Sequence, residues 1–365
     1  MRARAALTFP TTVVAPATLA PSALALCSQL TGRLTRPLRM LGLVLLAAGL
    51  SMLLVRPAAA ATPPIGMLKQ FRVPTANSQP RFITNGADGN RWFVEGNAPN
   101  IGRITPAGDI TEFGPACQAC LLSDIVQGAA GTLYYTSNDP ALGRITTSGE
   151  ILPAVAIPNS TAVGGDIAAH GNEIWFNDFN NDALWRYDTV SGQFTRFDVP
   201  EPLDVAVDPA GIVWFPSSVA QAIGRLDPTT GAVSLAPTKG SPSQITVAAN
   251  GDVWFTDPAP VAGPPPFGEA VGRVHPATMA VSEFPVGPGV RPLGIAAAPA
   301  AASPFGPVWF TQNAKGNVAA ITDQGVITEG KAVKGSDPLG VTVDATGNPW
   351  YAMRSANKIA KLQLR

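Results

Sequence analysis

The sequence predicts an all-β fold, a seven-bladed β-propeller with four-stranded blades. An aromatic pair recurs seven times, each time after a turn signal, and successive pairs lie 39 to 42 residues apart except for one step of 55. A fixed period near 40 residues with several short strands per repeat is typical of propeller blades. The composition agrees, because 46% hydrophobic residues can fill a large core while 36 Gly and 36 Pro allow frequent turns. The seven pairs are Trp92-Phe93, Tyr134-Tyr135, Trp175-Phe176, Trp214-Phe215, Trp254-Phe255, Trp309-Phe310 and Trp350-Tyr351.

Residues 1–61 are predicted to be an N-terminal extension that ends in a secretory signal peptide, and residues 62–365 to form the propeller. The apolar run 41–55 follows three arginines and precedes residues 58–61, four alanines that suit signal peptidase. The run has 15 residues. A bilayer span needs about 20, so cleavage is favoured over a retained membrane anchor. We therefore expect an exported monomer, periplasmic or extracellular, with no membrane insertion after cleavage.

The charge distribution argues against nucleic acid as a partner. Residues 1–61 hold six arginines and no acid, which leaves 19 basic against 25 acidic side chains in the rest of the chain. A net acidic domain repels the phosphate backbone instead of attracting it.

Each repeat is interpreted as four strands, most clearly in residues 202–236. Four apolar runs in this segment are separated by turns that contain Pro, Gly and Asp. The two rings of each aromatic pair are expected to pack into the two neighbouring blade interfaces. The third strand carries a recurring glycine, such as Gly224, which is expected to let the strands of one blade pass close to the next.

The two ends of the repeat region complement each other. The last repeat stops after its third strand at residues 362–365, whereas residues 68–73 precede the first repeat and resemble a fourth strand. We expect the N-terminal strand to complete the last blade and close the ring, which leaves no open sheet edge. Insertions at 258–269 and 299–307 account for the step of 55, and the first is expected on the face where the innermost strands begin.

Cys117 and Cys120 are the two cysteines beyond the N-terminal extension. A local disulfide is favoured in an oxidising compartment. A redox dithiol and a metal clip are the alternatives, although one cysteine pair cannot supply the four ligands of a tetrahedral site.

Three recurring segments resemble the blades of the virginiamycin B lyase (streptogramin lyase) family over residues 65–365. They are Pro-x-Gly-Ile, as at 292–295, Trp-Phe-Thr-Asp, as at 254–257, and Ile-Gly-Arg-Ile-Thr, as at 101–105. The resemblance implies a seven-bladed propeller. It also implies a lyase that opens a macrolactone by β-elimination, in which a base and an acid move protons and Mg²⁺ polarises the ester.

The chain departs from this family at the residues that carry the chemistry. In the family's last blade, the His of Glu-Pro-His-Gly-Ile is catalytic, and acids there and in Trp-Phe-Ala-Met-Glu hold the metal. The matching positions here are Leu339 for the His, Asp337 for the first acid and Arg354 for the second. The family's His in the preceding blade falls at Leu293, and its substrate-contacting Tyr falls at Arg81. Leucine cannot transfer a proton and arginine repels a cation, so we do not expect lyase activity by this mechanism.

Polar side chains gather where the innermost strand of each blade begins and the second strand ends, and these points converge around the propeller axis. Asp124, Asp166 and Asp204 could hold Ca²⁺ or Mg²⁺ through oxygen ligands, or move protons through raised pKa values. The alternative is that they cap strand starts by accepting backbone N–H bonds. A mouth that is acidic on one arc and basic on the other would also suit a zwitterionic or peptide-like ligand. The candidate ligand-binding residues are Arg81, Glu95, Asp124, Asp166, Asp178, Asp204, Gln244, Asp257 and Arg354.

Two functions follow from these observations. The first is an exported propeller without the family's lyase activity that binds a small molecule, peptide or protein at the channel mouth. The second is a metal-dependent enzyme on the same face, either a lyase with relocated residues or a lactone hydrolase that uses the three aspartates. The sequence leaves open whether the chain is an enzyme, because one fold hosts both functions. A tightly bound divalent ion would separate them.

Overall fold

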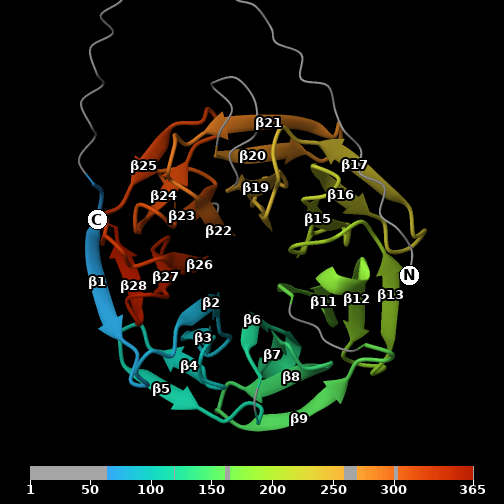
Figure 1. Ribbon diagram of the computed structural model, residues 1–365, viewed down its shortest axis with the longest axis horizontal. Coiled ribbons are helices and arrows are strands. Elements are labelled where there is room, and N and C mark those ends of the chain that lie inside the picture. The colour runs from blue at the N-terminus through green and yellow to red at the C-terminus, as the bar shows by residue number, and fades with distance from the viewer. Residues whose placement is uncertain (1–63, 119, 161–164, 259–268, 300–302, 365) are drawn as a thin grey trace, which may run out of the picture. The chain divides into compact units, whose positions relative to one another are not determined.

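The computed structural model describes residues 64–118, 120–160, 165–258, 269–299 and 303–364, which all belong to one compact unit, residues 62–365. Seven four-stranded antiparallel sheets make up this unit as blades arranged around a central axis (Figure 1). The prediction of an all-β, seven-bladed propeller is confirmed. The predicted extension and signal peptide, residues 1–61, lie outside the described residues.

Each blade contributes one strand to each of four concentric positions. The innermost strands are β2 (Pro80–Asn85), β6 (Leu122–Gln127), β10 (Ile167–His170), β14 (Ala206–Val207), β18 (Gln244–Val247), β22 (Pro292–Ala297) and β26 (Pro338–Val343). The second strands are β3 (Arg91–Glu95), β7 (Thr132–Ser137), β11 (Glu173–Asp178), β15 (Val213–Ser217), β19 (Val253–Asp257), β23 (Val308–Gln312) and β27 (Pro349–Met353). The third strands are β4 (Ile101–Ile104), β8 (Ala141–Thr146), β12 (Ala183–Asp188), β16 (Ala222–Leu226), β20 (Ala270–His275), β24 (Asn317–Ile321) and β28 (Lys358–Gln363). The outermost strands are β5 (Ile110–Phe113), β9 (Ile151–Ala156), β13 (Phe194–Asp198), β17 (Val233–Pro237), β21 (Ala280–Pro285), β25 (Ile327–Glu329) and β1 (Met67–Arg72).

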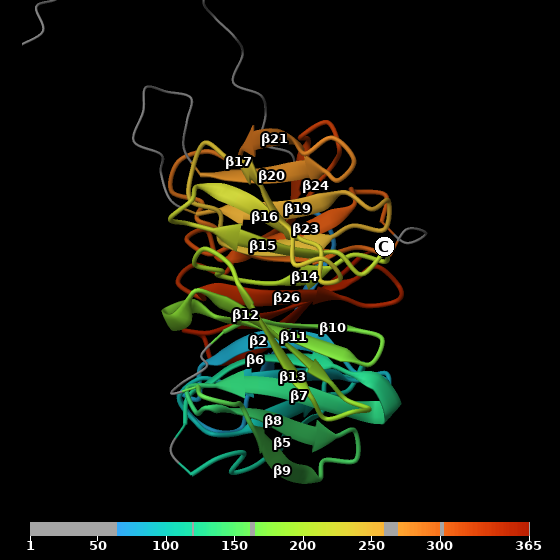
Figure 2. The ribbon, with the colours of Figure 1, turned by 90° about the vertical axis from the view of Figure 1, so that its right-hand side faces the viewer.

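We number the blades from 1 (β2–β5) to 7 (β26–β28 with β1). Two single-turn 3₁₀ helices, Ala129–Gly131 and Phe179–Asn181, are the only helices among the described residues, and neither is long enough to span a membrane. Seen from the side, innermost strands such as β26 and β2 run roughly along the axis of the ring (Figure 2). We call the face at which the innermost strands begin the upper face, and the opposite face the lower face.

The ring closes through the N-terminal strand, as the sequence predicts. Strand β1 pairs antiparallel with β28 along its whole length and forms the outer edge of blade 7. The side chain of Asn357, in the turn before β28, secures the chain that leads from β1 into blade 1. Its Nδ2 donates to the Thr75 carbonyl over 2.9 Å, and its Oδ1 accepts from Ser78 Oγ and from the Gln79 N–H, both over 3.1 Å.

The aromatic pairs form the interfaces between blades. Trp175 packs with Phe215 of blade 4, whereas its neighbour Phe176 packs with Tyr134 of blade 2. Successive side chains of a strand point to opposite faces of the sheet, so each pair serves both interfaces of its blade. The predicted placement of the rings is therefore confirmed.

The recurring glycine of the third strand has a different role from the one expected. Gly224 lies opposite Phe215 in the same blade, and a Cβ at this glycine would be 2.1 Å from Phe215 Cζ. The missing side chain therefore makes room for an aromatic ring of the adjacent strand in the same blade, not for a close approach of the next blade.

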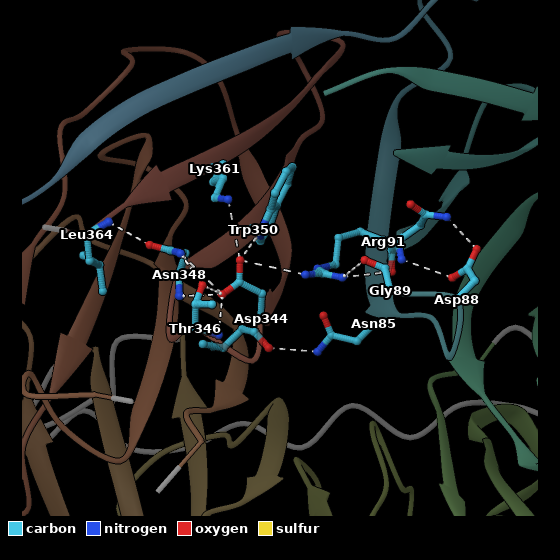
Figure 3. Close-up of polar contacts among 12 residues, drawn as sticks. Asn85, Asp88, Gly89, Arg91, Asp344, Thr346, Asn348, Trp350, Lys361 and Leu364 are labelled. Atoms are coloured by element: carbon cyan, nitrogen blue, oxygen red, sulfur yellow. Dashed lines mark hydrogen bonds and ion pairs between the residues drawn. The ribbon is translucent and has the colours of Figure 1, made fainter. Parts of the chain in front are cut away.

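A buried polar cluster joins blades 7 and 1 on the lower face (Figure 3). Asp344 accepts hydrogen bonds from Trp350 Nε1 over 3.0 Å and from the Asn348 N–H over 3.0 Å. Arg91 of blade 1 and Lys361 lie 3.8 and 3.7 Å from the same carboxylate. All partners of this acid therefore belong to the protein itself, and the cluster fixes the seam where the ring closes.

The loop that leads into β6 contains the Cys117–Cys120 disulfide that the sequence favours, with the two Cα atoms 5.8 Å apart. The Tyr135 hydroxyl donates to the Ala116 carbonyl over 3.0 Å and holds this loop against blade 2. Cys120 is buried in the interface between blades 1 and 2.

Candidate functional site

The candidate site is the upper mouth of a central channel. The innermost strands of all seven blades line a cavity of about 340 Å³, whose lining includes Asp124, Asp204 and Gln244. Lower in the channel the lining is formed by small side chains such as Ala168 and Thr246. A cavity of this size is at the lower end of the range for small-molecule sites.

Asp124 and Asp204 fasten each blade to the one after it. Asp124 Oδ1 accepts from the Ile125 N–H over 2.7 Å, and its Oδ2 accepts from the Ile167 N–H of the next blade over 3.2 Å. Asp204 does the same with the N–H groups of Val205 and Ile245, over 2.6 and 2.8 Å. Both carboxyl groups thus cap strand starts, which is the alternative to metal binding or proton transfer that the sequence left open.

Asp166 is used differently, although it occupies the equivalent position in blade 3. Its Oδ2 accepts one hydrogen bond, over 2.5 Å, from the Nε2 of Gln244 in blade 5. This contact passes over blade 4 instead of joining adjacent blades. Among the described residues, no backbone N–H donates to the Asp166 carboxylate. Of the three acids, Asp166 is therefore the one that can accept further hydrogen bonds on an oxygen without a donor.

Arg81 lies near these acids at the start of β2. The aliphatic part of its side chain packs over Gly96, where an added Cβ would lie only 2.5 Å from Arg81 Cδ. Burial and the nearby Arg354 lower the pKa of Arg81, whereas Asp166 and Asp124 act in the opposite direction. The structure therefore brings together both charge signs that the sequence places at the mouth.

Burial sets the protonation states of the three aspartates. It raises the pKa of Asp124 and of Asp204 well above the ordinary value, and Asp166 adds to the shift in each case. Burial also raises the pKa of Asp166. The hydrogen bond from Gln244 and the charge of Arg81 oppose this shift, and the resulting pKa is about 6. With a pKa of about 6, Asp166 is largely ionised at neutral pH.

The last blade holds an ion pair where the family resemblance implies a metal site. Arg354 Nε donates to Asp337 Oδ2 over 2.6 Å, and Ser355 Oγ donates to the same oxygen over 3.2 Å. Asn313 Nδ2 donates to Asp337 Oδ1. Burial alone would raise the pKa of Asp337, but the hydrogen bonds from Arg354 and Asn313 lower it below its ordinary value.

These residues do not fit the Mg²⁺ that the family resemblance implies. The guanidinium of Arg354 already neutralises Asp337, and a second positive charge beside it would be repelled. Leu339 carries no group that could transfer a proton. We therefore derive no catalytic step through a metal at this position.

A divalent cation at Asp124, Asp166 and Asp204 stays a prediction. Among the described residues, the group of three potential ligands whose atoms all lie within 4.8 Å of one another is Cys117, Cys120 and Asp139, not the three aspartates. The sulfur atoms of that group are joined in the disulfide. Two of the three aspartates already accept backbone hydrogen bonds on both oxygens.

Three other predicted site residues end second strands and are buried beneath the loops of the upper face. Glu95, Asp178 and Asp257 are 0%, 1% and 1% exposed, and none of them lines the channel cavity. Asp178 accepts from Asn181 Nδ2, and Asp257 accepts from the Ser241 N–H. The first strand, which pairs with the second, separates these positions from the axis.

Glu95 has a partner that the sequence did not indicate. Burial and the carboxylate of Glu112 raise the pKa of Glu95 to about 8. Glu112 lies on the outermost strand β5 and accepts from the N–H and the hydroxyl of Thr75, both over 2.9 Å. The two carboxyl groups come from different strands and share no periodic position, so the repeat pattern carries no signal for this pair.

The two histidines of the chain lie away from the mouth. His170 ends β10 at the lower face, and His275 ends the third strand β20 and is exposed. Most of the insertion at 258–269, namely residues 259–268, lies outside the described residues.

The comparisons with known proteins agree with this geometry. The model of the virginiamycin B lyase family matches residues 61–256 and 167–365. The structure of a streptogramin B lyase is 25% identical to the chain, with a TM-score of 0.72, and the match covers 82% of this chain and 98% of that one. Virginiamycin B lyase from Staphylococcus aureus is also 25% identical, with a TM-score of 0.70 and coverage of 82% and 99%.

A more distant structural match shows the fold alone. The structure described as YCF48 bound to D1 peptide is 13% identical, with a TM-score of 0.61 and coverage of 84% of this chain and 100% of that one. A search of curated proteins found no significant match.

Proposed function

The chain belongs to the virginiamycin B lyase family, and from this premise we propose that it is a binding member of the family that does not open macrolactones. Its ligand, a small molecule, a peptide or a segment of a protein, occupies the upper mouth of the channel. The observation that carries the proposal is the Arg354–Asp337 ion pair, which stands where the family's metal-binding acids are expected.

The chemistry of the mouth supports binding over catalysis. Leu339 stands in the place of the catalytic His, and Arg354 replaces an acid. Asp124 and Asp204 accept backbone hydrogen bonds on both oxygens, and burial raises the pKa of both carboxyl groups. A propeller neighbour is described as bound to a peptide, so this fold accommodates such a ligand.

Incubation with virginiamycin B and Mg²⁺ tests the absence of lyase activity. We expect liquid chromatography with mass spectrometry to recover the compound unchanged, while the S. aureus lyase converts it in a parallel reaction. β-Elimination would give an isomer of unchanged mass and new retention time, and lactone hydrolysis would give a product heavier by one water. Either product would refute the proposal, and the second would favour a lactone hydrolase.

A thermal-shift screen of small polar molecules and short peptides tests the binding function. Ligands of the mouth should raise the melting temperature of the wild type, because they stabilise the folded state by mass action. The same ligands should lose this effect when Gln244, at the mouth, is replaced by Ala. Stabilisation that persists in this variant would place the binding site elsewhere.

We further propose that the mature chain is exported as a monomer to the periplasm or the medium, which the apolar run 41–55 and the four alanines 58–61 support. Expression of the full chain in a bacterial host, followed by N-terminal sequencing of the exported protein, should find a start close to residue 61 or 62. An intact N-terminus on a cytoplasmic product would contradict this proposal.

A further inference from the structure

Among the described residues, Arg81 is a cation that forms no ion pair. All 25 acidic side chains of the protein lie within the described residues, and none of them forms an ion pair with Arg81. The nearby Arg354 is already neutralised by Asp337. A partly buried guanidinium with unused donors gains most from a carboxylate, which it can bind through two parallel hydrogen bonds.

Asp166, just before β10 in blade 3, is the matching anion near Arg81. It interacts electrostatically with Arg81, yet the two side chains form no ion pair. Its carboxylate receives one hydrogen bond, from the neutral amide of Gln244. Asp124 and Asp204 differ in that both oxygens of each carboxyl group already accept a backbone N–H.

We infer that the ligand of the channel mouth is a zwitterion with an amino-acid headgroup, such as a free amino acid or a short peptide, whose carboxylate binds Arg81 and whose ammonium group binds Asp166 beside Gln244. This inference rests on the proposed binding function and specifies its ligand class. A molecule with both charges can bridge two nearby opposite charges that form no ion pair with each other. A ligand with one charge would leave either Arg81 or Asp166 without a partner in a partly buried site, which is unfavourable.

The surroundings of the two charges favour a small ligand with apolar side chains. Leu293 and Leu339 are half-buried at the upper starts of β22 and β26. Below the mouth, the cavity of about 340 Å³ is lined partly by Ala168 and Ala296. We therefore choose leucylleucine as the probe, since it has one charge of each sign and two apolar side chains.

The test is isothermal titration calorimetry with leucylleucine and two blocked forms, N-acetyl-leucylleucine and leucylleucine amide, near pH 7.5. We expect the wild type to bind the zwitterion at least tenfold more tightly than either blocked form. Arg81→Gln should abolish the preference for the free carboxylate but keep the preference for the free amine, and Asp166→Asn should do the reverse. Arg196→Gln and Asp198→Asn are matched controls, because both residues lie on the outer strand β13 and pair with each other.

The pH dependence supplies an independent readout. The groups that face Asp166 are Asp124, Asp204, Arg81 and Gln244, and the pKa of Asp166 lies at about 6. Affinity for leucylleucine should therefore fall as the pH drops below 6. The affinity of the Asp166→Asn variant should not change across the same range.

Two results would overturn this inference. One is equal affinity for the zwitterion and both blocked forms, and the other is no binding of leucylleucine at millimolar concentration. In either case, a ligand of another class that stabilises the wild type but not the Gln244→Ala variant would leave the binding function standing. Conversion of virginiamycin B, by contrast, would refute the proposed function itself.

Discussion

The buried carboxyl pair of Glu95 and Glu112 makes a prediction about stability that can be worked out from the structure. Burial and the charge of Glu112 raise the pKa of Glu95 from 4.5 to about 8. The folded chain therefore keeps a proton that the unfolded chain releases between these values, so this group makes the free energy of unfolding fall as the pH rises. The substitution Glu95→Gln replaces the protonated acid with a neutral group of the same shape and removes this dependence.

The size of the effect follows from the pKa shift. At 1.36 kcal/mol per unit, the full shift corresponds to ~5 kcal/mol. We expect about 2 kcal/mol in measurement, because the loop that carries Thr75 and Ser78 can admit water to the ionised acid. The variant should match the wild type below about pH 4, where Glu95 is protonated in both the folded and the unfolded chain, and exceed it by about this amount near pH 9.

Urea unfolding of both proteins at several pH values between about 4 and 9 measures the difference directly. The raised pKa values of Asp124 and Asp204 also make stability fall with pH, but they are common to both proteins and cancel in the difference. Glu150→Gln, in an exposed turn, is the matched control. Parallel pH profiles for the wild type and Glu95→Gln would refute the raised pKa of Glu95.

Three further predictions concern closure, packing and the ion pair. Asn357→Ala removes the side-chain bonds that hold the chain between β1 and β2, so the free energy of unfolding should fall by about 2 to 3 kcal/mol in urea titrations. Gly224→Ala places a methyl group against Phe215 and should lower the free energy of unfolding by about 1 to 3 kcal/mol in the same assay. Gly231→Ala, with open space around it, would measure the strain of a positive φ alone. Arg354→Gln removes the partner that lowers the pKa of Asp337. The stability lost, about 1 kcal/mol, should be largest near neutral pH and disappear as the pH falls through the lowered pKa of Asp337.

The periodic features of the fold could be predicted from the sequence because packing dictates them. Each blade must fill two interfaces, and an adjacent pair such as Trp175 and Phe176 supplies one ring to each. The missing fourth strand of the last repeat likewise predicted its replacement by the N-terminal segment. The role of Gly224 was misassigned, because the sequence shows that a small residue is needed but not which neighbour occupies the space.

The polar site could be predicted only in part. The sequence located Arg81 and Asp166 at the mouth, but it treated all the aspartates there as equivalent. Their roles depend on whether the next blade presents a backbone N–H, as Ile167 does for Asp124 and Ile245 does for Asp204. Local register also matters: β2 and β6 carry equivalent β-bulges, between Pro80 and Ile83 and between Leu122 and Ile125. Arg81 is therefore equivalent to Ser123 and lies one position further from the core isoleucine than Asp124 does.

The way the blades are tied together explains how such a mouth can change its chemistry without losing the fold. Thr311 of blade 6 donates its hydroxyl to the carbonyl of Leu339 in blade 7, and Thr256 donates to the carbonyl of Leu293. These hydrogen bonds use the backbone carbonyl of the accepting residue, so they do not depend on its side chain. A leucine can therefore occupy the position of a catalytic His while the start of the strand stays in place. The side chains at positions 293 and 339 can therefore differ from those of the family without a change in the backbone hydrogen bonds that join the blades.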